Sequence, residues 1–446
     1  MPSHISSSSP FTPSVDQDFS REREESQSLR WPLHPSFYLP HSVRSVAGVF
    51  PTVYGLLGRQ VPPALAPHLS PPLFSFLPQG SPRSAGRVLF LLLDSLGFKE
   101  LAQAPVLSRL YQRHGTWITS VFPTVTSTAT TSLYQGLSPA RHGMAGHVVW
   151  MEPPGLLVDT LRMIPAMELE KNAQPLDPRP WRGAPGLAGL PAGQGAPGML
   201  LLNRSILGSG LSGVNHPRER LAGYGEPLEG ASLGANLLAG LPGGWVGWYL
   251  PTIDYLSHGF GGVSPEVTQA LHQIEENLTW LARRLAPEVL ADTTLVVASD
   301  HGQSLIQRRV NLKGPALDAL TPLTRGIGFS GRVLHVYLRD GLGKPQLQQA
   351  AQALEQLAGE HGRVVGFAQA RPWLGEGGEE HSLSEEALRR RLGDWLVVLE
   401  EGIHWDKTGT PMETHRHSTP LVSQHGGLAW DEMVVPLIVA PLSEVL

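Results

Sequence analysis

Three aspartates and three histidines stand at or just after the ends of short apolar runs, or just before the last of these runs, where they could bind metal ions together. They are Asp94 in VLFLLLD, Asp254 and His258 in WYLPTIDYLSH, Asp300 and His301 in LVVASDH, and His425 in SQHGG. Carboxylate and imidazole groups are the oxygen and nitrogen ligands that zinc accepts in proteins. Each residue alone could be a turn former or a cap. Four separate segments that each carry a carboxylate or an imidazole next to an apolar run predict a shared site.

Several carboxylates brought together without a counter-charge would repel one another, and bound divalent ions would neutralise them. We expect two ions. One would be held by Asp94, Asp300 and His301, and the other by Asp254, His258 and His425. Three side-chain ligands with an open position are the pattern of a catalytic zinc site. The expected cofactors are therefore two divalent metal ions, zinc in the first place and manganese as the alternative.

The stretch FPTVTSTATT at 122–131 offers six hydroxyl groups as possible nucleophiles. A threonine alkoxide is not accessible at neutral pH unless a strong cation contacts the oxygen, as a metal ion does when it acidifies bound water. A hydroxyl at the start of a helix would also have backbone N–H groups directed at an incoming phosphate. These arguments do not choose among the six hydroxyls, and a polar helix start without chemistry stays possible.

The elements that must position these residues are six continuous apolar runs, which are typical of strands buried on both faces of a parallel sheet. The runs are 87–93, 116–121, 198–203, 245–250, 293–299 and 433–440. Helical patterns lie between them, and the clearest begins at Ser264 as N-cap with Pro265 at the first helical position. We therefore expect an α/β fold with a mainly parallel central sheet and helices on both faces. Side chains at the carboxyl ends of such strands converge on one crevice.

The domain prediction separates a disordered lead-in (1–30), a catalytic domain (31–310 and 405–446) and a small inserted α+β subdomain (311–404). The lead-in is polar and Ser-rich, without the apolar centre of a signal peptide. Residues 151–197 are rich in Gly and Pro and predict a long irregular excursion. The role of the stretch 151–240 is not assigned.

The composition excludes several classes of protein. The chain has no cysteine, which excludes disulfides and thiolate zinc sites. The 34 basic and 39 acidic residues include no dense basic block, so neither a nucleic-acid polymer nor a membrane is an expected partner. The longest apolar run is too short to span a bilayer. A cytoplasmic protein acting on a small molecule is expected, and the oligomeric state is not predicted.

The ordered set Asp94, PTVT, DYLSH, SDHG and HGG resembles the alkaline phosphatase superfamily, in its branch of nucleotide pyrophosphatases and type I phosphodiesterases. The resemblance covers about residues 86–310 and 420–440. In that branch the second threonine of P-T-x-T is the nucleophile, followed by G-L and H-G. Here PTVT is followed by QGLSPARHG, so the matching residue is Thr126.

The resemblance implies that Thr126 is also a metal ligand, completing the group of Asp94, Asp300 and His301. It further implies two-metal hydrolysis of a phosphodiester, nucleotide pyrophosphate or similar small phosphate ester through a covalent phosphothreonine. Many phosphodiesterases of this branch carry an asparagine where this sequence has Ala129, which leaves the preference between monoester and diester open.

Other functions stay open or are disfavoured. A phosphomonoesterase, a phosphonate hydrolase or a metal-dependent phosphomutase would keep most of these ligands, and a non-catalytic metal-binding member is a further alternative. A sulfatase would need a Cys or Ser where this chain has a threonine. The GSGLSG stretch at 208–213 does not predict a dinucleotide site, because Pro217 follows almost at once.

The remaining histidines and aromatic residues are not expected to bind metal. We expect His142 and His147 to shape the loop beside the nucleophile, and His415 and His417 to be exposed. The aromatic side chains Trp245, Trp248 and Tyr249 fit core packing better than base stacking.

Overall fold

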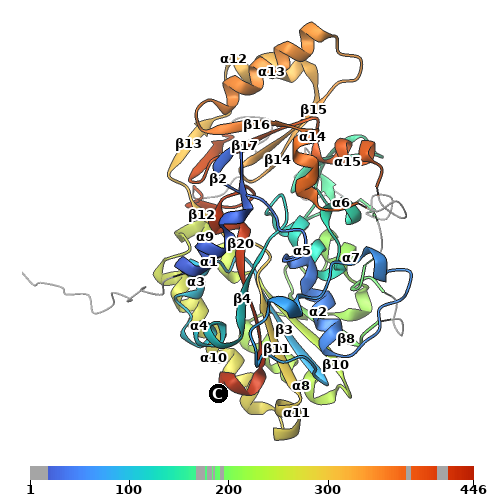
Figure 1. Ribbon diagram of the computed structural model, residues 1–446, viewed down its shortest axis with the longest axis vertical. Coiled ribbons are helices and arrows are strands. Elements are labelled where there is room, and N and C mark those ends of the chain that lie inside the picture. Colours follow the sequence, from blue (N-terminus) through green and yellow to red (C-terminus); the bar gives the residue numbers. More distant parts are fainter. Residues whose placement is uncertain are drawn as a thin grey trace, which may run out of the picture.

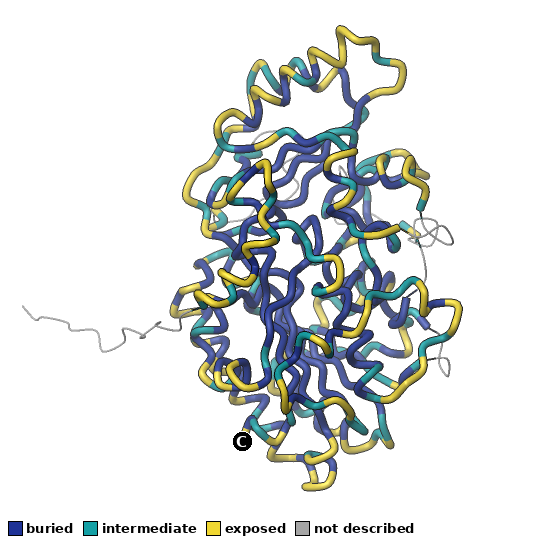
Figure 2. The backbone as a smooth tube through the Cα atoms, in the orientation of Figure 1, coloured by how far each residue is buried: buried dark blue, intermediate teal, exposed yellow. Residues whose placement is uncertain are grey.

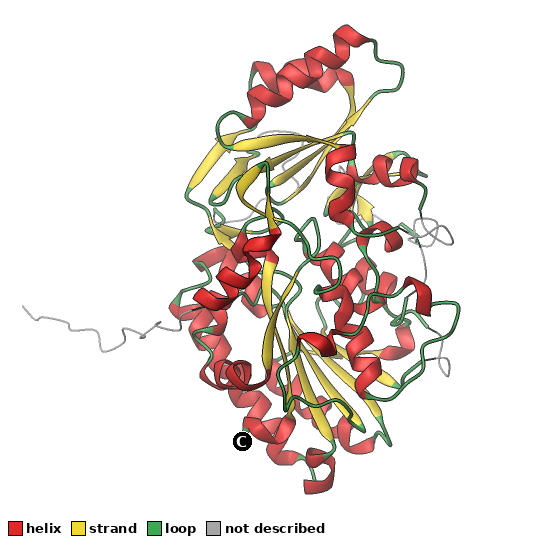
Figure 3. Ribbon diagram, viewed as in Figure 1, coloured by secondary structure: helices red, strands yellow, loops and turns green. Residues whose placement is uncertain are grey.

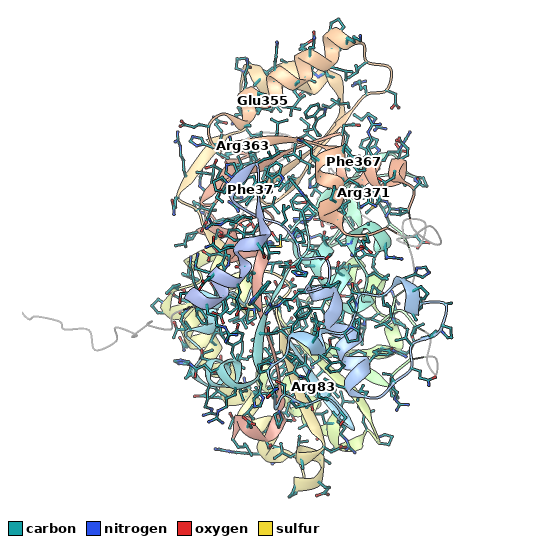
Figure 4. All side chains as sticks on the ribbon, in the orientation of Figure 1. Phe37, Arg83, Glu355, Arg363, Phe367 and Arg371 are labelled. Atoms are coloured by element: carbon teal, nitrogen blue, oxygen red, sulfur yellow. The ribbon has the colours of Figure 1, made fainter. Side chains whose placement is uncertain are left out.

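The computed structural model of the chain describes residues 19–166, 176–177, 183, 186–190, 195–377, 383–408 and 420–446. Two seven-stranded sheets dominate these residues, one in the lower and one in the upper half of Figure 1. Figure 3 shows helices against both sheets. In Figure 4, Arg363 marks the upper sheet and Glu355 marks the helix that packs on it. Arg83 lies near the opposite end of the molecule.

The central sheet has the strand order β4-β20-β11-β3-β10-β8-β9. Its strands are β3 (Arg87–Leu93), β4 (Gly115–Thr119), β8 (Gly198–Asn203), β9 (Leu221–Tyr224), β10 (Gly244–Leu250), β11 (Thr293–Ala298) and β20 (Val434–Pro441). All six predicted strands lie in it, and β9 is the strand that the sequence missed. Strand β20 pairs antiparallel with both β11 and β4, whereas β8, β9, β10, β3 and β11 pair in parallel. The prediction of a mainly parallel central sheet is confirmed.

Both faces of the central sheet are buried, which explains the unbroken apolar runs. In β3, Leu89, Leu91 and Leu93 face one hydrophobic cluster, and Val88, Phe90 and Leu92 face another. Helices α8 (Pro227–Gly240) and α10 (Pro265–Arg284) contribute to the first cluster, and α2 (Val49–Leu56) and α5 (Thr126–Gln135) to the second. Figure 2 shows that the strands of the central sheet are buried along most of their length. The prediction of helices on both faces is confirmed.

The predicted N-terminus of the longest central helix agrees with the structure. Helix α10 begins at Pro265, and the Ser264 hydroxyl accepts a hydrogen bond of 3.3 Å from the N–H of Val267. This is the geometry of a serine N-cap.

The second sheet is antiparallel and has the order β16-β17-β15-β14-β5-β6-β7. Its strands are β5 (Val148–Met151), β6 (Leu156–Asp159), β7 (Ile164–Pro165), β14 (Thr324–Ser330), β15 (Val333–Leu338), β16 (Gly362–Gly366) and β17 (Trp395–Leu399). Helices α12 (Pro315–Leu320) and α13 (Lys344–Ala358) pack on it through a third hydrophobic cluster. An insertion confined to 311–404 is not confirmed, because β5, β6 and β7 come from an earlier part of the chain.

The other predicted boundaries stay predictions. Of the predicted lead-in, residues 1–18 lie outside the described residues, and α1 (Ser20–Glu25) and a short 3-10 helix (Ser26–Leu29) follow them. Much of the Gly- and Pro-rich excursion also lies outside them. Within the described ranges, no helix combines the length and the apolar character that a bilayer crossing needs.

Candidate metal centre

The six predicted metal ligands lie at one edge of the central sheet. Asp94 directly follows β3, and Asp300 and His301 are the second and third residues after the end of β11. Asp254 and His258 lie one turn apart on α9 (Thr252–Phe260), which follows β10. His425 follows β19 (Ser423–Gln424) and precedes the antiparallel strand β20, so it reaches the same edge from the opposite chain direction. The expected convergence at the carboxyl ends of the strands is present.

Asp94, Asp300 and His301 form a fully buried group whose ligand atoms lie within 4.8 Å of one another. Nε2 of His301 is 3.6 Å from Oδ1 of Asp94 and 3.4 Å from Oδ2 of Asp300. These two carboxylate oxygens are buried and have no hydrogen-bond partner among the described residues. Two buried carboxyl oxygens without a hydrogen-bond partner, both facing one imidazole nitrogen, fit a cation between them, because such atoms are otherwise unfavourable in a protein interior.

The second group forms around one carboxylate oxygen, Oδ1 of Asp254. Nε2 of His258 is 3.4 Å from it and Nε2 of His425 is 3.6 Å from it. Nδ1 of His258 lies 3.0 Å from the carbonyl oxygen of Ser423, and Nδ1 of His425 lies 2.8 Å from that of Thr124. A backbone carbonyl that accepts from Nδ1 leaves the lone pair on Nε2, which is how metal-binding histidines are commonly oriented.

The structure also places His301 beside the second group. The ligand atoms of Asp254, His301 and His425 lie within 4.8 Å of one another, and the rings of His301 and His425 stack at 3.9 Å. His258 is next to this set, with its ring centroid 5.2 Å from that of His425. The two predicted groups are therefore adjacent, with His301 between them.

The charges of this cluster perturb its carboxylates in opposite directions. Burial raises the pKa of Asp94 well above its usual value, and the charges of Asp300 and Asp254 raise it further. Burial acts on the pKa of Asp254 in the same direction, but His258, His425 and His301 together lower it to about 2. Burial also lowers the pKa of His425 well below its ordinary value. Three carboxyl groups and three imidazoles gathered at one place form the donor set that a divalent cation requires.

Thr126 is the first residue of α5, and its Oγ1 lies 3.2 Å from Nε2 of His301. The other five hydroxyls of FPTVTSTATT are buried, whereas Thr126 is partly exposed. Four of the five form hydrogen bonds to backbone carbonyls, namely those of Thr124, Ser127, Thr130 and Thr131. Thr126 is thus the hydroxyl of this stretch that contacts a candidate metal ligand.

Two neighbours of the ligands were missed as functional residues by the sequence interpretation. The Tyr249 hydroxyl donates a hydrogen bond to Oδ2 of Asp94, although the sequence assigned Tyr249 to core packing alone. Ser95 contacts ligands of both groups through its backbone N–H and its hydroxyl. Their positions could have indicated a role at the site, because Ser95 is next to Asp94 in the sequence and Tyr249 lies near the end of β10, the strand beside β3.

The remaining histidines have other surroundings. His142 is buried, its Nε2 lies 2.7 Å from the Ser132 hydroxyl, and burial lowers its pKa to about 3, so it is a neutral structural residue. Nε2 of His147 lies 3.6 Å from Oδ1 of Asp159. His415 and His417 lie outside the described residues. Ala129 is fully buried among apolar side chains, so position 129 presents no polar group to the site.

Comparisons with known proteins identify the family and the fold of the chain. The profile of the family described as type I phosphodiesterase / nucleotide pyrophosphatase matches residues 88–186 and 243–420. Murine ectonucleotide pyrophosphatase / phosphodiesterase 5 is similar in structure, with a TM-score of 0.54, 17% identity and coverage of 79% of this chain and 87% of its own. Its inactive threonine-to-alanine variant in complex with AMP has a TM-score of 0.53 at the same identity and coverage.

Phosphonoacetate hydrolase from Sinorhizobium meliloti 1021, in complex with phosphonoformate, has a TM-score of 0.54 at 18% identity and covers 80% of this chain and 93% of its own. No curated protein sequence matches the chain. The chain shares its fold with these solved structures. Because the family profile covers more than half of the sequence, this chain belongs to the type I phosphodiesterase / nucleotide pyrophosphatase family.

Members of this family are hydrolases of phosphodiester and pyrophosphate bonds, and the prediction of a phosphoester hydrolase is confirmed at that level. The residues between the two matched segments include β8, β9 and α8, so part of the central sheet lies outside the family profile. His425 also lies beyond it.

Proposed function

We propose that this protein hydrolyses phosphodiesters or nucleotide pyrophosphates through a phosphothreonine intermediate on Thr126. The observation that carries the proposal is the 3.2 Å separation between Oγ1 of Thr126 and Nε2 of His301, the histidine that adjoins both ligand groups. Thr126 is also partly exposed, which a phosphoryl acceptor must be, and it begins a helix of ten residues. The N–H groups at the start of such a helix favour a bound phosphate.

We infer that two divalent ions, zinc or manganese, complete this site. Asp94, Asp300, His301 and Thr126 would hold one ion, and Asp254, His258 and His425 would hold the other. Bound there, the ions would supply the positive charge that makes the threonine hydroxyl acidic and that stabilises the transferring phosphoryl group. The unpaired oxygens of Asp94 and Asp300 support the first set. The Nδ1 contacts of His258 and His425 with backbone carbonyls support the second.

The proposed reaction is a double displacement. Oγ1 of Thr126 attacks phosphorus, the bond between phosphorus and the leaving oxygen breaks, and the leaving group departs with the electron pair and takes up a proton. Water then attacks the phosphothreonine, the bond between phosphorus and Oγ1 breaks, and the threonine hydroxyl is restored. The products are an alcohol or phosphate leaving group and a phosphate monoester, or inorganic phosphate if the substrate is a monoester.

The substrate is proposed to be a small phosphate ester or a nucleotide. The family supports this class, and the murine relative binds AMP in its inactive variant. The buried methyl group of Ala129 contributes no hydrogen bond to a phosphoryl oxygen, so the choice between diester and monoester rests on the rest of the site.

A substrate panel tests the proposal. Metal-free protein, reconstituted with zinc or with manganese, would be assayed on bis(4-nitrophenyl) phosphate, 4-nitrophenyl phosphate, thymidine 5′-monophosphate 4-nitrophenyl ester and phosphonoacetate. We expect the highest kcat/KM on the two diesters, and none after chelation. A strong preference for the monoester or for phosphonoacetate would assign the site to those reactions instead.

Replacing the proposed nucleophile tests its role. Thr126→Ala should lower kcat by about 10³-fold or more, because loss of a covalent nucleophile removes the main reaction path. Thr126→Ser keeps a hydroxyl and should retain a measurable part of the activity. Metal content, measured by elemental analysis, should be the same in Thr126→Ala as in the wild type. Wild type quenched with acid during turnover of a diester should carry one phosphoryl group, with its second ester group still attached, on the peptide that contains Thr126. A Thr126→Ala variant that keeps most of its activity contradicts the assignment.

A further inference from the structure

Ser95 has a backbone conformation that serine rarely adopts, at the centre of the ligand cluster. Its φ is +64°, and among the described residues the only other non-glycine residue with positive φ is Met163. The side chain of Ser95 is fully buried. Glycine would take this conformation without strain. Strain of this kind persists where the surrounding structure needs the side chain, and it concentrates at functional sites.

The hydroxyl of Ser95 connects a ligand of one group with a ligand of the other. Oγ lies 3.1 Å from Nδ1 of His301 and 3.0 Å from Oδ1 of Asp254. Since the carboxylate can only accept, the serine hydrogen points to Asp254, and the serine oxygen is left to accept from Nδ1–H of His301. Together with the carbonyl oxygen of Gly302, which lies 3.2 Å from the same Nδ1, this arrangement fixes the tautomer of His301 with its lone pair on Nε2, the atom that faces Asp94 and Asp300. The backbone N–H of Ser95 also donates to Oδ1 of Asp300, at 3.3 Å.

Two further buried, uncharged side chains extend this connection to the far end of the cluster. Nε2 of Gln303 donates to the Ser95 hydroxyl at 3.1 Å and to Oδ1 of Asp254 at 2.6 Å. The amide oxygen of Gln303 accepts a hydrogen bond from the Ser423 hydroxyl, and the Ser423 carbonyl lies 3.0 Å from Nδ1 of His258. The chain Ser95–Gln303–Ser423 therefore runs beneath both groups of ligands without adding charge.

We infer that Ser95 is a positioning residue that couples the two metal-binding groups. An ion bound by Asp94, Asp300 and His301 would hold the imidazole of His301 in place, and so would fix the hydroxyl of Ser95 and the carboxylate of Asp254. The second group is then prepared for its ion before that ion arrives, which is positive coupling between two sites. This inference rests on the proposed two-metal centre and adds a role for a residue that touches neither substrate nor ion.

Ser95→Gly tests the coupling, because it removes the hydroxyl and at the same time removes the backbone strain. The metal-free variant should have a higher Tm than metal-free Ser95→Ala, because both variants lose the hydroxyl and only glycine relieves the strain. Its zinc affinity, measured by competition with a chelating dye, should fall by about 10- to 100-fold. The two binding steps, which should be cooperative in the wild type, should become independent. Ser95→Ala lacks the hydroxyl but keeps the strain, so it should lose zinc affinity to the same extent with a lower Tm than Ser95→Gly.

The matched control is Ser108→Ala, which removes another buried serine hydroxyl. That hydroxyl donates to the backbone carbonyl of Leu101 at 2.6 Å, away from the ligands, and the variant should bind zinc as the wild type does. Ser95→Gly protein that binds two zinc ions with wild-type affinity and cooperativity overturns the inference alone. A wild type that binds fewer than two ions overturns it together with the proposed metal centre.

Discussion

Asp94 shows how a single residue is prepared for metal binding. The Tyr249 hydroxyl holds one carboxylate oxygen, and the other oxygen is unpaired and faces His301. Burial and the charge of Asp94 raise the pKa of Tyr249 well above its ordinary value, so the tyrosine stays protonated and donates. A donor outside the ligand set orients the ligand in this way and leaves one oxygen for the ion.

Tyr249→Phe should therefore weaken metal binding and activity. We expect kcat/KM to fall by about 10- to 100-fold, because loss of a hydrogen bond to a metal ligand has effects of this size. Added zinc should restore part of the loss, which separates weakened metal binding from a direct effect on the reaction. The control is Tyr134→Phe, which removes a buried hydroxyl without a hydrogen-bond partner among the described residues. Equal activity losses in the two variants would contradict this role for Tyr249.

Among the elements, helices α4 (Pro105–His114) and α10 are joined by a buried carboxylate. Oε1 of Glu275, on α10, accepts a hydrogen bond of 2.8 Å from the N–H of Leu107, in the first turn of α4. The start of α4 is thereby capped by a neighbouring helix, which satisfies an N–H group that a helix terminus leaves free. Burial nevertheless raises the pKa of Glu275 to about 7.

This raised pKa predicts the pH dependence of one contribution to stability. The native state keeps the Glu275 proton up to about pH 7, whereas the unfolded state, with a pKa of 4.5, loses it earlier. The contribution of Glu275 to the free energy of unfolding is therefore most favourable below pH 4.5 and is lost as pH rises through 7. Glu275→Gln should gain stability relative to the wild type between pH 5 and pH 8, by on the order of 2 kcal/mol. Urea unfolding of both proteins at the two pH values measures the difference, and a difference that does not change with pH contradicts the prediction.

For the whole molecule, a buried ion pair joins the two large sheets beside the site. Nε of Arg332, directly before β15, lies 2.6 Å from Oε1 of Glu432 in α16 (Trp430–Met433), and both side chains are buried. The other carboxylate oxygen of Glu432 accepts from the N–H of Gly427, and its backbone carbonyl accepts from that of Gly302. The pair thus fixes the loops that carry His425 and His301 against the second sheet.

Breaking this pair should destabilise the fold strongly. Arg332→Met leaves the Glu432 carboxylate buried and unpaired, and it should lower the free energy of unfolding by about 3–5 kcal/mol. The double variant Arg332→Met/Glu432→Gln removes both charges and should be more stable than Arg332→Met alone. Chemical denaturation of the metal-free proteins measures both effects. A double variant that is less stable than either single variant contradicts this interpretation of the pair.

The sequence by itself determined the central sheet and the edge at which the ligands meet. The apolar stretches VLFLLL (88–93) and LVVA (295–298) are unbroken because both faces of these strands are buried, and this is a local property of the chain. Five of the six ligands lie at or shortly after the ends of parallel strands, so their convergence follows from the parallel pairing that such runs favour. His425 instead precedes the antiparallel strand β20. The family followed from the motifs that these ends carry.

Thr126, which the resemblance had already singled out, lies against His301. Only the tertiary structure decided that His301 stands between the two groups and that Ser95 and Tyr249 contact them. It also joined β5 to β14, residues far apart in the chain, so that the second sheet extends beyond 311–404. Strand partners and contacts between distant side chains depend on packing across the whole chain, because the hydrophobic period of a segment specifies its buried face but not what covers that face.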